Sequence, residues 1–179
     1  SKISKEMEIS ILPCDTSNSE SLQDDINYDI DTSILIRSLL DDTLFYNNVD
    51  SPITTNGMRK IKEYSKNQGM VGNIDIACIA VGAAAEYPQC FPDIDRQYEK
   101  NKIINASLNT FSDQLNILEN KCFFPAGGTY IIPGKFSSLN DYVAQPSFDQ
   151  LKLAVDSTNT CRSISYLEGG NSIRKKGEK

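Results

Sequence analysis

The most regular pattern of apolar and polar positions lies in the middle of the chain. Apolar residues there recur at alternating intervals of four and three, which keeps them on one side of an α-helix. Asp93 is a suitable N-cap before this stretch, and the Gly-Pro-rich sequence after it stops a helix. The pattern predicts one long amphipathic helix over about residues 94–121. Its apolar stripe consists of Ile104, Leu108, Phe111, Leu115, Leu118 and Cys122.

Shorter periodic stretches predict three further helices. One runs from a cap at residue 31 or 32 through the apolar residues of segment 32–45. A second covers residues 58–66 and turns Met58 and Ile61 inward, with basic residues outward. A third begins at the N-cap Ser147 and continues to about residue 155.

Segment 74–86 fits two structures. Ile76, Ile79 and Ala83 share one face of a helix, whereas the apolar run up to Val81 also fits a buried strand. The length of the run favours a helix, and the strand remains the open alternative. The segment is not a dinucleotide-binding turn, because that fingerprint needs three glycines and Gly82 stands alone here.

The remaining segments have weaker patterns. Residues 129–136 combine a β-prone stretch with a Pro-Gly turn and predict a small hairpin, and residues 161–167 predict a short strand. Together these elements predict a mainly α protein of the α+β class, a compact helical domain around the long helix with a small β-hairpin after it. We expect a flexible arm over 1–24, one globular domain over 25–168 and a mobile basic tail over 169–179.

Composition narrows the range of functions. The chain has 179 residues, with 39% hydrophobic and 23% charged, which suits a folded domain. Its net charge of -6, without a basic stripe, argues against nucleic acid as a partner. No apolar run approaches the ~20 residues of a membrane-spanning helix. Histidine is absent, which excludes Ser-His-Asp and Cys-His catalysis and imidazole-ligated zinc.

The chain contains five cysteines, and no two of them form a C-x-x-C motif. This spacing argues against a zinc ribbon and a thioredoxin-type redox pair. Four cysteines lie in the region expected to fold and are the disulfide candidates, namely Cys78, Cys90, Cys122 and Cys161. Sequence does not choose among the three pairings that four cysteines allow, and Cys14 would remain unpaired. The alternative is reduced thiols packed as small apolar side chains.

An aromatic cluster follows the long helix. Phe123, Phe124, Tyr130 and Phe136 lie within a Gly- and Pro-rich segment. If exposed, they would form an apolar patch of the kind that binds a protein partner. These four residues are the candidates for partner binding.

Carboxylates supply two alternative sites. Glu86, Asp93 and Asp95 flank the Cys90 segment, and a pair of them in one cleft would suit a hydrolase, although acids that border helix starts more often cap the helix.

Oxygen-bearing residues also alternate at the start of the expected domain, namely Asp25, Asn27, Asp29 and Asp31, and this spacing resembles the start of a calcium loop. Ile30 and Ile36 occupy positions where an EF-hand needs Gly and Glu, which weakens the metal-site hypothesis.

The cysteine usage, the aromatic segment and the lack of a catalytic constellation favour a non-catalytic structural or protein-interaction domain. We expect an extracytoplasmic location, either secreted, periplasmic or within a bacterial cell-envelope assembly of the secretion type, held by disulfide bonds. No signal peptide is recognisable, and one removed by processing would leave no trace. We expect a protein partner, no nucleic acid and no cofactor, and a homo-oligomer is compatible with the sequence.

Overall fold

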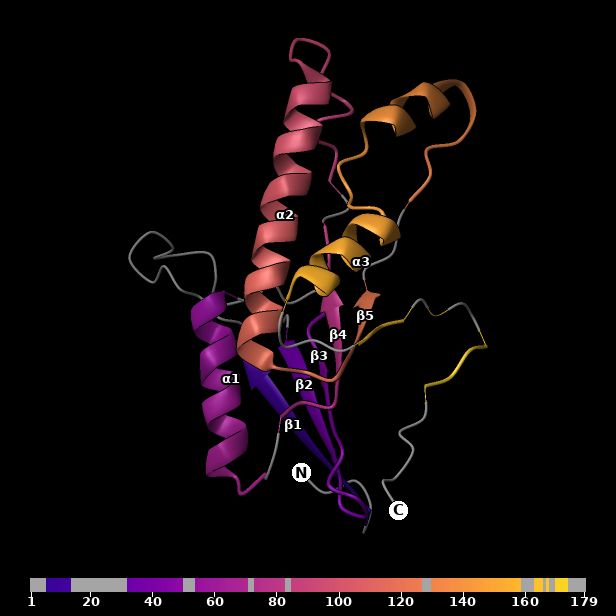
Figure 1. Ribbon diagram of the computed structural model, residues 1–179. Coiled ribbons are helices and arrows are strands. Elements are labelled where there is room, and N and C mark those ends of the chain that lie inside the picture. The colour runs from indigo at the N-terminus through magenta and orange to yellow at the C-terminus, as the bar shows by residue number, and fades with distance from the viewer. Residues whose placement is uncertain are drawn as a thin grey trace, which may run out of the picture.

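A computed structural model describes residues 6–13, 32–49, 54–70, 73–82, 85–126, 130–158, 163–165, 167 and 170–173. Within these residues the protein is an α/β domain built on a six-stranded mixed sheet with strand order β1-β2-β3-β4-β5-β6 (Figure 1). The strands are β1 (Met7–Pro13), β2 (Thr32–Ser38), β3 (Leu44–Asn47), β4 (Ile76–Ala80), β5 (Cys122–Ala126) and β6 (Ser163–Ile164). The helices are α1 (Thr55–Asn67), α2 (Arg96–Leu118), the 3-10 helix η2 (Gly134–Tyr142) and α3 (Phe148–Ser157).

The sheet has an antiparallel half and a parallel half. Strands β1, β2 and β3 pair antiparallel, whereas β4, β5 and β6 each add parallel to the preceding strand. Helices α1, α2 and α3 connect successive parallel strands, and right-handed crossovers that all step in one direction leave their helices on one face. Figure 1 shows the three α-helices on the same side of the sheet.

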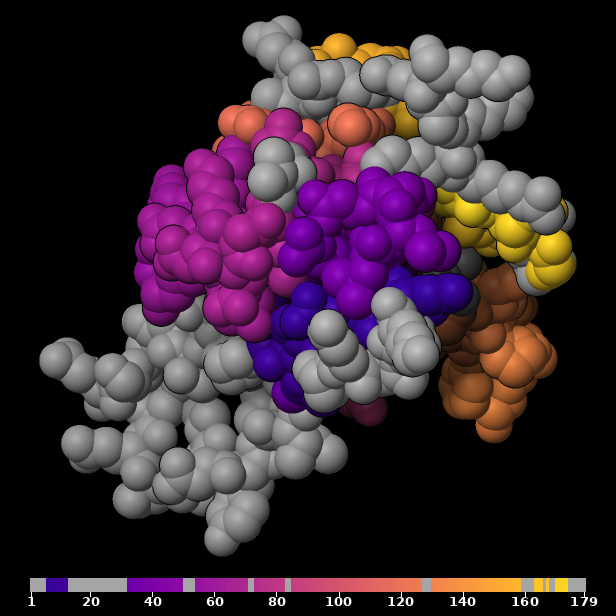
Figure 2. All heavy atoms as spheres, turned by 90° about the horizontal axis from the view of Figure 1, so that it is seen from below, coloured from indigo at the N-terminus to yellow at the C-terminus, as the bar shows by residue number. Residues whose placement is uncertain are grey.

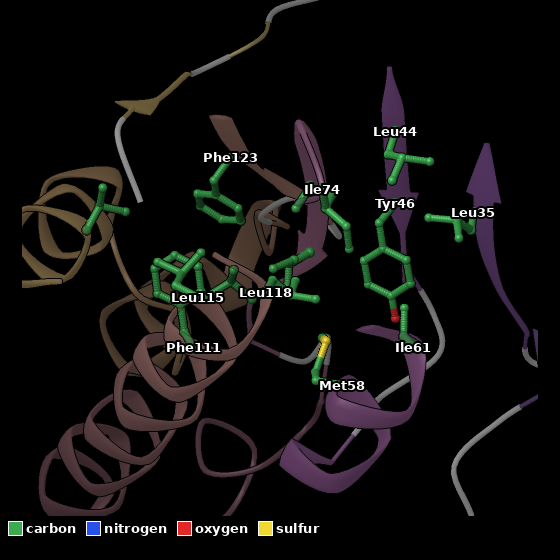
Figure 3. Packing of buried hydrophobic residues seen from close by; sticks show 14 of the residues in the cluster. Leu35, Leu44, Tyr46, Met58, Ile61, Ile74, Phe111, Leu115, Leu118 and Phe123 are labelled. Carbon is green, nitrogen blue, oxygen red and sulfur yellow. The ribbon is translucent and has the colours of Figure 1, made fainter. Parts of the chain in front are cut away.

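The main core lies between these helices and the sheet. Phe111, Leu115 and Leu118 of α2 and Met58 and Ile61 of α1 point toward the strands (Figure 3). The strand residues that meet them define the helix-covered face, which consists of Leu12, Leu35, Leu44, Tyr46, Ala77, Ile79 and Phe123.

The opposite face of the sheet is also apolar, and no described helix covers it. Paired residues of neighbouring strands point to the same side, so the register assigns each residue to a face. Two rows cross the sheet here and define the helix-free face: Ile9, Ile36, Phe45, Ile76 and Cys122 in one row, and Ile11, Ile34, Asn47, Cys78 and Phe124 in the other.

Buried polar side chains fix the register of the central strands. The Asp75 carboxylate accepts a hydrogen bond from the Leu44 backbone N–H at 3.1 Å and forms an ion pair with Lys121 at 2.9 Å. At the other end, the Asn48 side-chain oxygen accepts from the Ala80 N–H at 3.0 Å. The contacts of Leu44 and Asn48 align β3 with β4. The Asp75–Lys121 ion pair joins the residue before β4 to the residue before β5.

The fold differs from the predicted mainly helical domain, and that prediction is wrong. The segment 32–45 is not a helix but contains β2 and the start of β3. Periodicity does not separate a short buried strand from a helix when apolar residues are contiguous, as in Ile34, Leu35 and Ile36. Pairing with residues 7–13 and 44–47 supplies the backbone hydrogen bonds that decide for the strand.

Two further elements need correction. Segment 74–86 contains β4, so the strand alternative holds and the helix is wrong. No hairpin follows the long helix within the described residues, because β5 pairs parallel with β4 and Phe136 lies in η2. Both errors concern strands whose partners are far away in the sequence.

The other helix predictions are confirmed. Helix α2 begins after the N-cap Asp95, not after the predicted cap Asp93, and it ends at Leu118 with Glu119 in a left-handed conformation. The predicted stripe is buried up to that point except for Leu108, which is partly buried, whereas Cys122 belongs to β5. Helix α1 is confirmed with Thr54 as its N-cap. Helix α3 begins at the predicted cap Ser147, where Ser147 and Gln150 form a capping box.

The two edge strands of the sheet, β1 and β6, are formed by segments with weak sequence signals. Residues 7–13 fall in the predicted arm and form β1, which contacts α1 where the Tyr64 hydroxyl donates to Ser10 at 3.2 Å. Figure 2 shows α1 beside the first strands when the molecule is viewed from below. The predicted strand over 161–167 is confirmed only as the short β6.

No helix within the described residues is long and apolar enough to cross a membrane. This agrees with the prediction from the sequence.

Candidate functional site

A cavity of about 670 Å³ lies beyond the carboxyl ends of β4 and β5. Its walls come from residues 85–96, which lead from β4 into α2, and from residues 130–139, which lead from β5 into η2. In Figure 1 these segments stand above the arrowheads of the two strands, beside the first turns of α2. Ligands of α/β proteins commonly bind at this end of a parallel sheet.

The start of the first wall depends on a glycine. Gly82 has a φ of +82°, a backbone conformation that other residues rarely adopt. A Cβ at this position would also meet the Gln145 side chain at 3.2 Å. Gly82 therefore permits the turn by which the chain leaves β4.

Both walls are held by hydrogen bonds. Arg96 donates to the Phe91 carbonyl at 2.9 Å and lies 5.3 Å from the centre of the Tyr142 ring. The Asn140 side chain accepts from the Ile132 N–H at 2.8 Å and donates to the Ile132 carbonyl at 2.9 Å. These contacts connect the start of α2 with η2 and give the cavity a preformed shape.

Gln89 is the most buried polar residue in the wall, with 2% of its surface exposed. Its side-chain amide nitrogen donates to the Ala85 carbonyl and to the Tyr130 hydroxyl, and the same hydroxyl donates to the Ala85 carbonyl at 2.8 Å. This arrangement fixes the orientation of the amide, because the reverse orientation would place two acceptors together. The amide oxygen then has no hydrogen-bond partner among the described residues.

The electrostatic environment keeps Tyr130 neutral. Burial raises the pKa of its phenol, and the neighbouring Cys90 raises this pKa further, against a smaller opposing effect of the Gln89 hydrogen bond. The phenol therefore keeps its proton and remains a donor to Ala85. Two charged side chains of opposite sign, Glu86 and Arg96, complete the polar part of the lining.

The three candidate acids do not form a pair in one cleft. Glu86, Asp93 and Asp95 are all exposed, and of the three only Glu86 lines the cavity. Asp95 is the N-cap of α2 and accepts a hydrogen bond from the Tyr98 N–H at 2.9 Å. The position of Asp95 thus matches the capping role, and the arrangement offers no support for a carboxylate hydrolase.

The four aromatic candidates separate into three environments. Phe123 is fully buried and packs against Phe111 with ring centres 4.5 Å apart. Phe124 lies on the helix-free face and stacks on Phe45 at 6.1 Å. Tyr130 and Phe136 both line the cavity.

The described cysteines, Cys78, Cys90 and Cys122, carry free thiols in this structure, and Cys161 lies outside the described residues. Register places Cys122 opposite Ile76, two residues from Cys78, so their Cα atoms are roughly 8 Å apart, too far for a disulfide without backbone movement. Other pairings of the four candidates stay a prediction.

The calcium candidates Asp25, Asn27, Asp29 and Asp31 also lie outside the described residues. Within the described part of the chain, no group of three or more Cys, Asp or Glu residues could hold a metal ion. Calcium binding by these four residues stays a prediction.

The sequence patterns point to Tyr130, Phe136, Glu86 and Cys90 of the cavity lining but not to Gln89. A single glutamine between prolines carries no pattern, and its role depends on a residue 41 positions away. A scan against protein-family models and searches of curated proteins and of solved structures find no match to this chain. Proposals about function therefore rest on the residues and their geometry.

Proposed function

We propose that the protein is a non-catalytic protein-interaction domain whose helix-free face binds a second copy of the chain. One observation carries the proposal, namely that both faces of the sheet are apolar while described helices cover only one of them. Antiparallel sheets with one face in water usually alternate apolar and polar residues. Strand β2 instead places Ile34, Leu35 and Ile36 in succession.

Charge favours a second copy as the occupant. The two rows of the helix-free face contain no charged residue, although the chain carries a net charge of -6. Two copies can therefore meet at this face without placing like charges against each other. Depletion of charge is typical of the centre of a protein interface, and a shared apolar patch suits a two-fold dimer.

The size of the face sets the expected strength of association. Five strands spaced about 4.8 Å apart, with about five residues each at about 3.3 Å, give a projected face of roughly 400 Å² per copy. Two such faces bury roughly 800 Å², which is below the range of stable specific interfaces and typical of weak, transient ones. We therefore expect a reversible dimer whose population rises with protein concentration.

Sedimentation equilibrium over a range of protein concentrations tests this proposal. We expect the Ile36→Lys variant to stay monomeric, because the dimer would bury a charge at the centre of the interface. Leu153→Lys is the matched control, since Leu153 is 70% exposed on α3, whose buried side packs on the helix-covered face. Ile36→Thr is a milder substitution for the case in which Ile36→Lys does not fold. Circular dichroism checks the folding of each variant.

The outcomes separate clearly. A wild-type dimer that Ile36→Lys abolishes and Leu153→Lys retains would support the proposal. A wild-type protein that is monomeric at every concentration, or a dimer unaffected by Ile36→Lys and Ile36→Thr, would overturn it.

We further propose an extracytoplasmic location, secreted, periplasmic or within a cell-envelope assembly. Its support is the number of cysteines, which in an oxidising compartment can form disulfides. Titration of thiols in the denatured, unreduced protein tests it. A count of five free thiols would contradict this location.

A further inference from the structure

We propose that Asn47 selects a second copy of this chain as the partner of the helix-free face, by pairing with Asn47 of that copy on the two-fold axis. The inference rests on the proposed function, since it concerns the same face and the same dimer. Three observations carry it, namely the composition of the face, the hydrogen bonding of the Asn47 amide and the place of Asn47 in the sheet.

Asn47 differs in chemistry from the rest of the helix-free face. The other residues in its two rows are isoleucines, phenylalanines and the cysteines Cys78 and Cys122. A thiol is only a weak donor and a weak acceptor, whereas an amide has two donors and a strong acceptor. Asn47 is therefore the one strong hydrogen-bonding side chain that this face presents to a partner.

The amide of Asn47 has an open donor. Its oxygen accepts a hydrogen bond from the Val49 backbone N–H at 2.8 Å, which fixes the orientation of the amide, because the reverse orientation would place two donors together. Within the part of the chain that the structure describes, the amide nitrogen donates to no group. The residue is half-buried and this nitrogen is not enclosed, so water accepts its hydrogen bonds in the monomer.

Association at the helix-free face would remove that water. Opposite an apolar residue, the Asn47 nitrogen would then be a buried donor without a partner, which is costly. The matching face of the second copy offers one strong side-chain acceptor, the oxygen of its own Asn47, which keeps a free lone pair beside the bond from Val49. A residue of a two-fold dimer meets its own copy only on the axis, so the axis should pass beside Asn47.

The position of Asn47 in the sheet agrees with such an axis. Strand β3 is the middle one of the strands β1 to β5 that form the face, and Asn47 lies between Ile34 of β2 and Cys78 of β4. An axis at the middle strand lets the two faces overlap across their whole width. In coiled coils, a single buried asparagine that pairs across the interface fixes register and partner at some cost in stability.

Affinities between labelled full-length chains test the inference. Wild-type and variant chains carry a donor or an acceptor dye at the N-terminus, and energy transfer gives the Kd of each self-pairing and of the mixed pairing. A substitution away from the axis acts independently in the two copies. The mixed Kd then equals the geometric mean of the two self-pairing values, after correction for the statistical weight of a mixed pair. A residue that meets its own copy departs from this mean.

Two substitutions should shift the mixed pairing in opposite directions. With Asn47→Leu, an unpaired amide faces an apolar side chain in the mixed dimer alone, so its Kd should lie about tenfold above the mean. With Asn47→Asp, like charges meet only in the self-pairing, and in the mixed dimer the carboxylate accepts from the wild-type amide. This mixed Kd should lie about tenfold below the mean.

Ile34→Val is the matched control, because Ile34 is the register partner of Asn47 and stays apolar, and its mixed pairing should give the mean. Asn47→Asp keeps an acceptor for the Val49 N–H and carries the test by itself if Asn47→Leu does not fold.

The outcomes distinguish this inference from the proposed function. Opposite shifts for the two Asn47 variants, with none for Ile34→Val, support the inference. Mixed pairings at the mean, or shifted in the same direction for both Asn47 variants, overturn it. The proposed function stands in that case if Ile36→Lys still abolishes the dimer. A wild-type chain that does not associate with itself overturns both.

Discussion

Phe123 and Phe124 are neighbours in β5 but have different surroundings, because successive side chains of a strand point to opposite faces. Phe123 is fully buried under α2, whereas Phe124 is half-buried on the helix-free face and contacts Phe45. The same contrast separates Leu35, which is 1% exposed, from its neighbour Ile36. Both faces of the sheet are therefore apolar, whereas the described helices cover only one of them.

This difference shows that the strands contain more apolar residues than the described core buries. Strands buried on both faces read as continuous apolar runs, whereas strands with one wet face alternate. Strand β2 belongs to the first type, although its Ile34 and Ile36 remain partly accessible. An apolar sheet face that the fold leaves without a described covering layer is the feature that most needs a partner.

The largest expected effect compares the two phenylalanines directly. Phe123→Ala should lower the free energy of unfolding by about 3–5 kcal/mol, because it leaves a cavity under α2. Phe124→Ala should cost only about 1–2 kcal/mol, since it loses partial burial and one aromatic contact. Urea unfolding of the dilute monomer measures both. Equal costs would mean that the helix-free face is packed as tightly as the core, which would break the comparison.

The second-largest effect concerns how the free energy of unfolding depends on pH through Tyr46 on the helix-covered face. Burial raises the pKa of Tyr46 to about 12, with a smaller opposing effect of the Ser33 hydroxyl. Below pH 10 both states keep the phenol proton, and between about pH 10 and 12 only the unfolded state loses it. Stability therefore falls as pH rises through this window, by about 2–3 kcal/mol from this residue.

The Tyr46→Phe variant tests this contribution. It should show a shallower loss of unfolding free energy between pH 10 and 12 than the wild type, measured by urea unfolding at each pH. An identical pH dependence of the two proteins would show that Tyr46 is not kept neutral by burial.

The smallest effect leaves stability unchanged and concerns thiol reactivity. Burial raises the pKa of Cys78 to about 11, so the reactive thiolate is about a hundredfold less populated than in an ordinary cysteine at the same pH. Cys90 is exposed beside the cavity and should react with a disulfide reagent well before Cys78. Mass spectrometry of the labelled native protein measures the order, and labelling of Cys78 before Cys90 would contradict the protection of Cys78 by burial.

Three helices were predictable because their determinants are local. The stripe of α2, the inward residues Met58 and Ile61 of α1 and the cap Ser147 of α3 all lie within a few residues of the positions they control. Helical hydrogen bonds join residues four apart, so a short window contains the necessary information. The cavity was predictable only in part, through Tyr130 and Phe136, since neither pattern nor spacing marks Gln89.

The tertiary structure alone decided that segments 32–38, 44–47 and 76–80 are strands and that β5 adds parallel to β4. Strand pairing joins residues far apart in sequence, such as Ala77 and Phe123, and an apolar run by itself suits either a buried helix or a strand. The same long-range pairing determines which apolar residues the helices cover and which form the helix-free face.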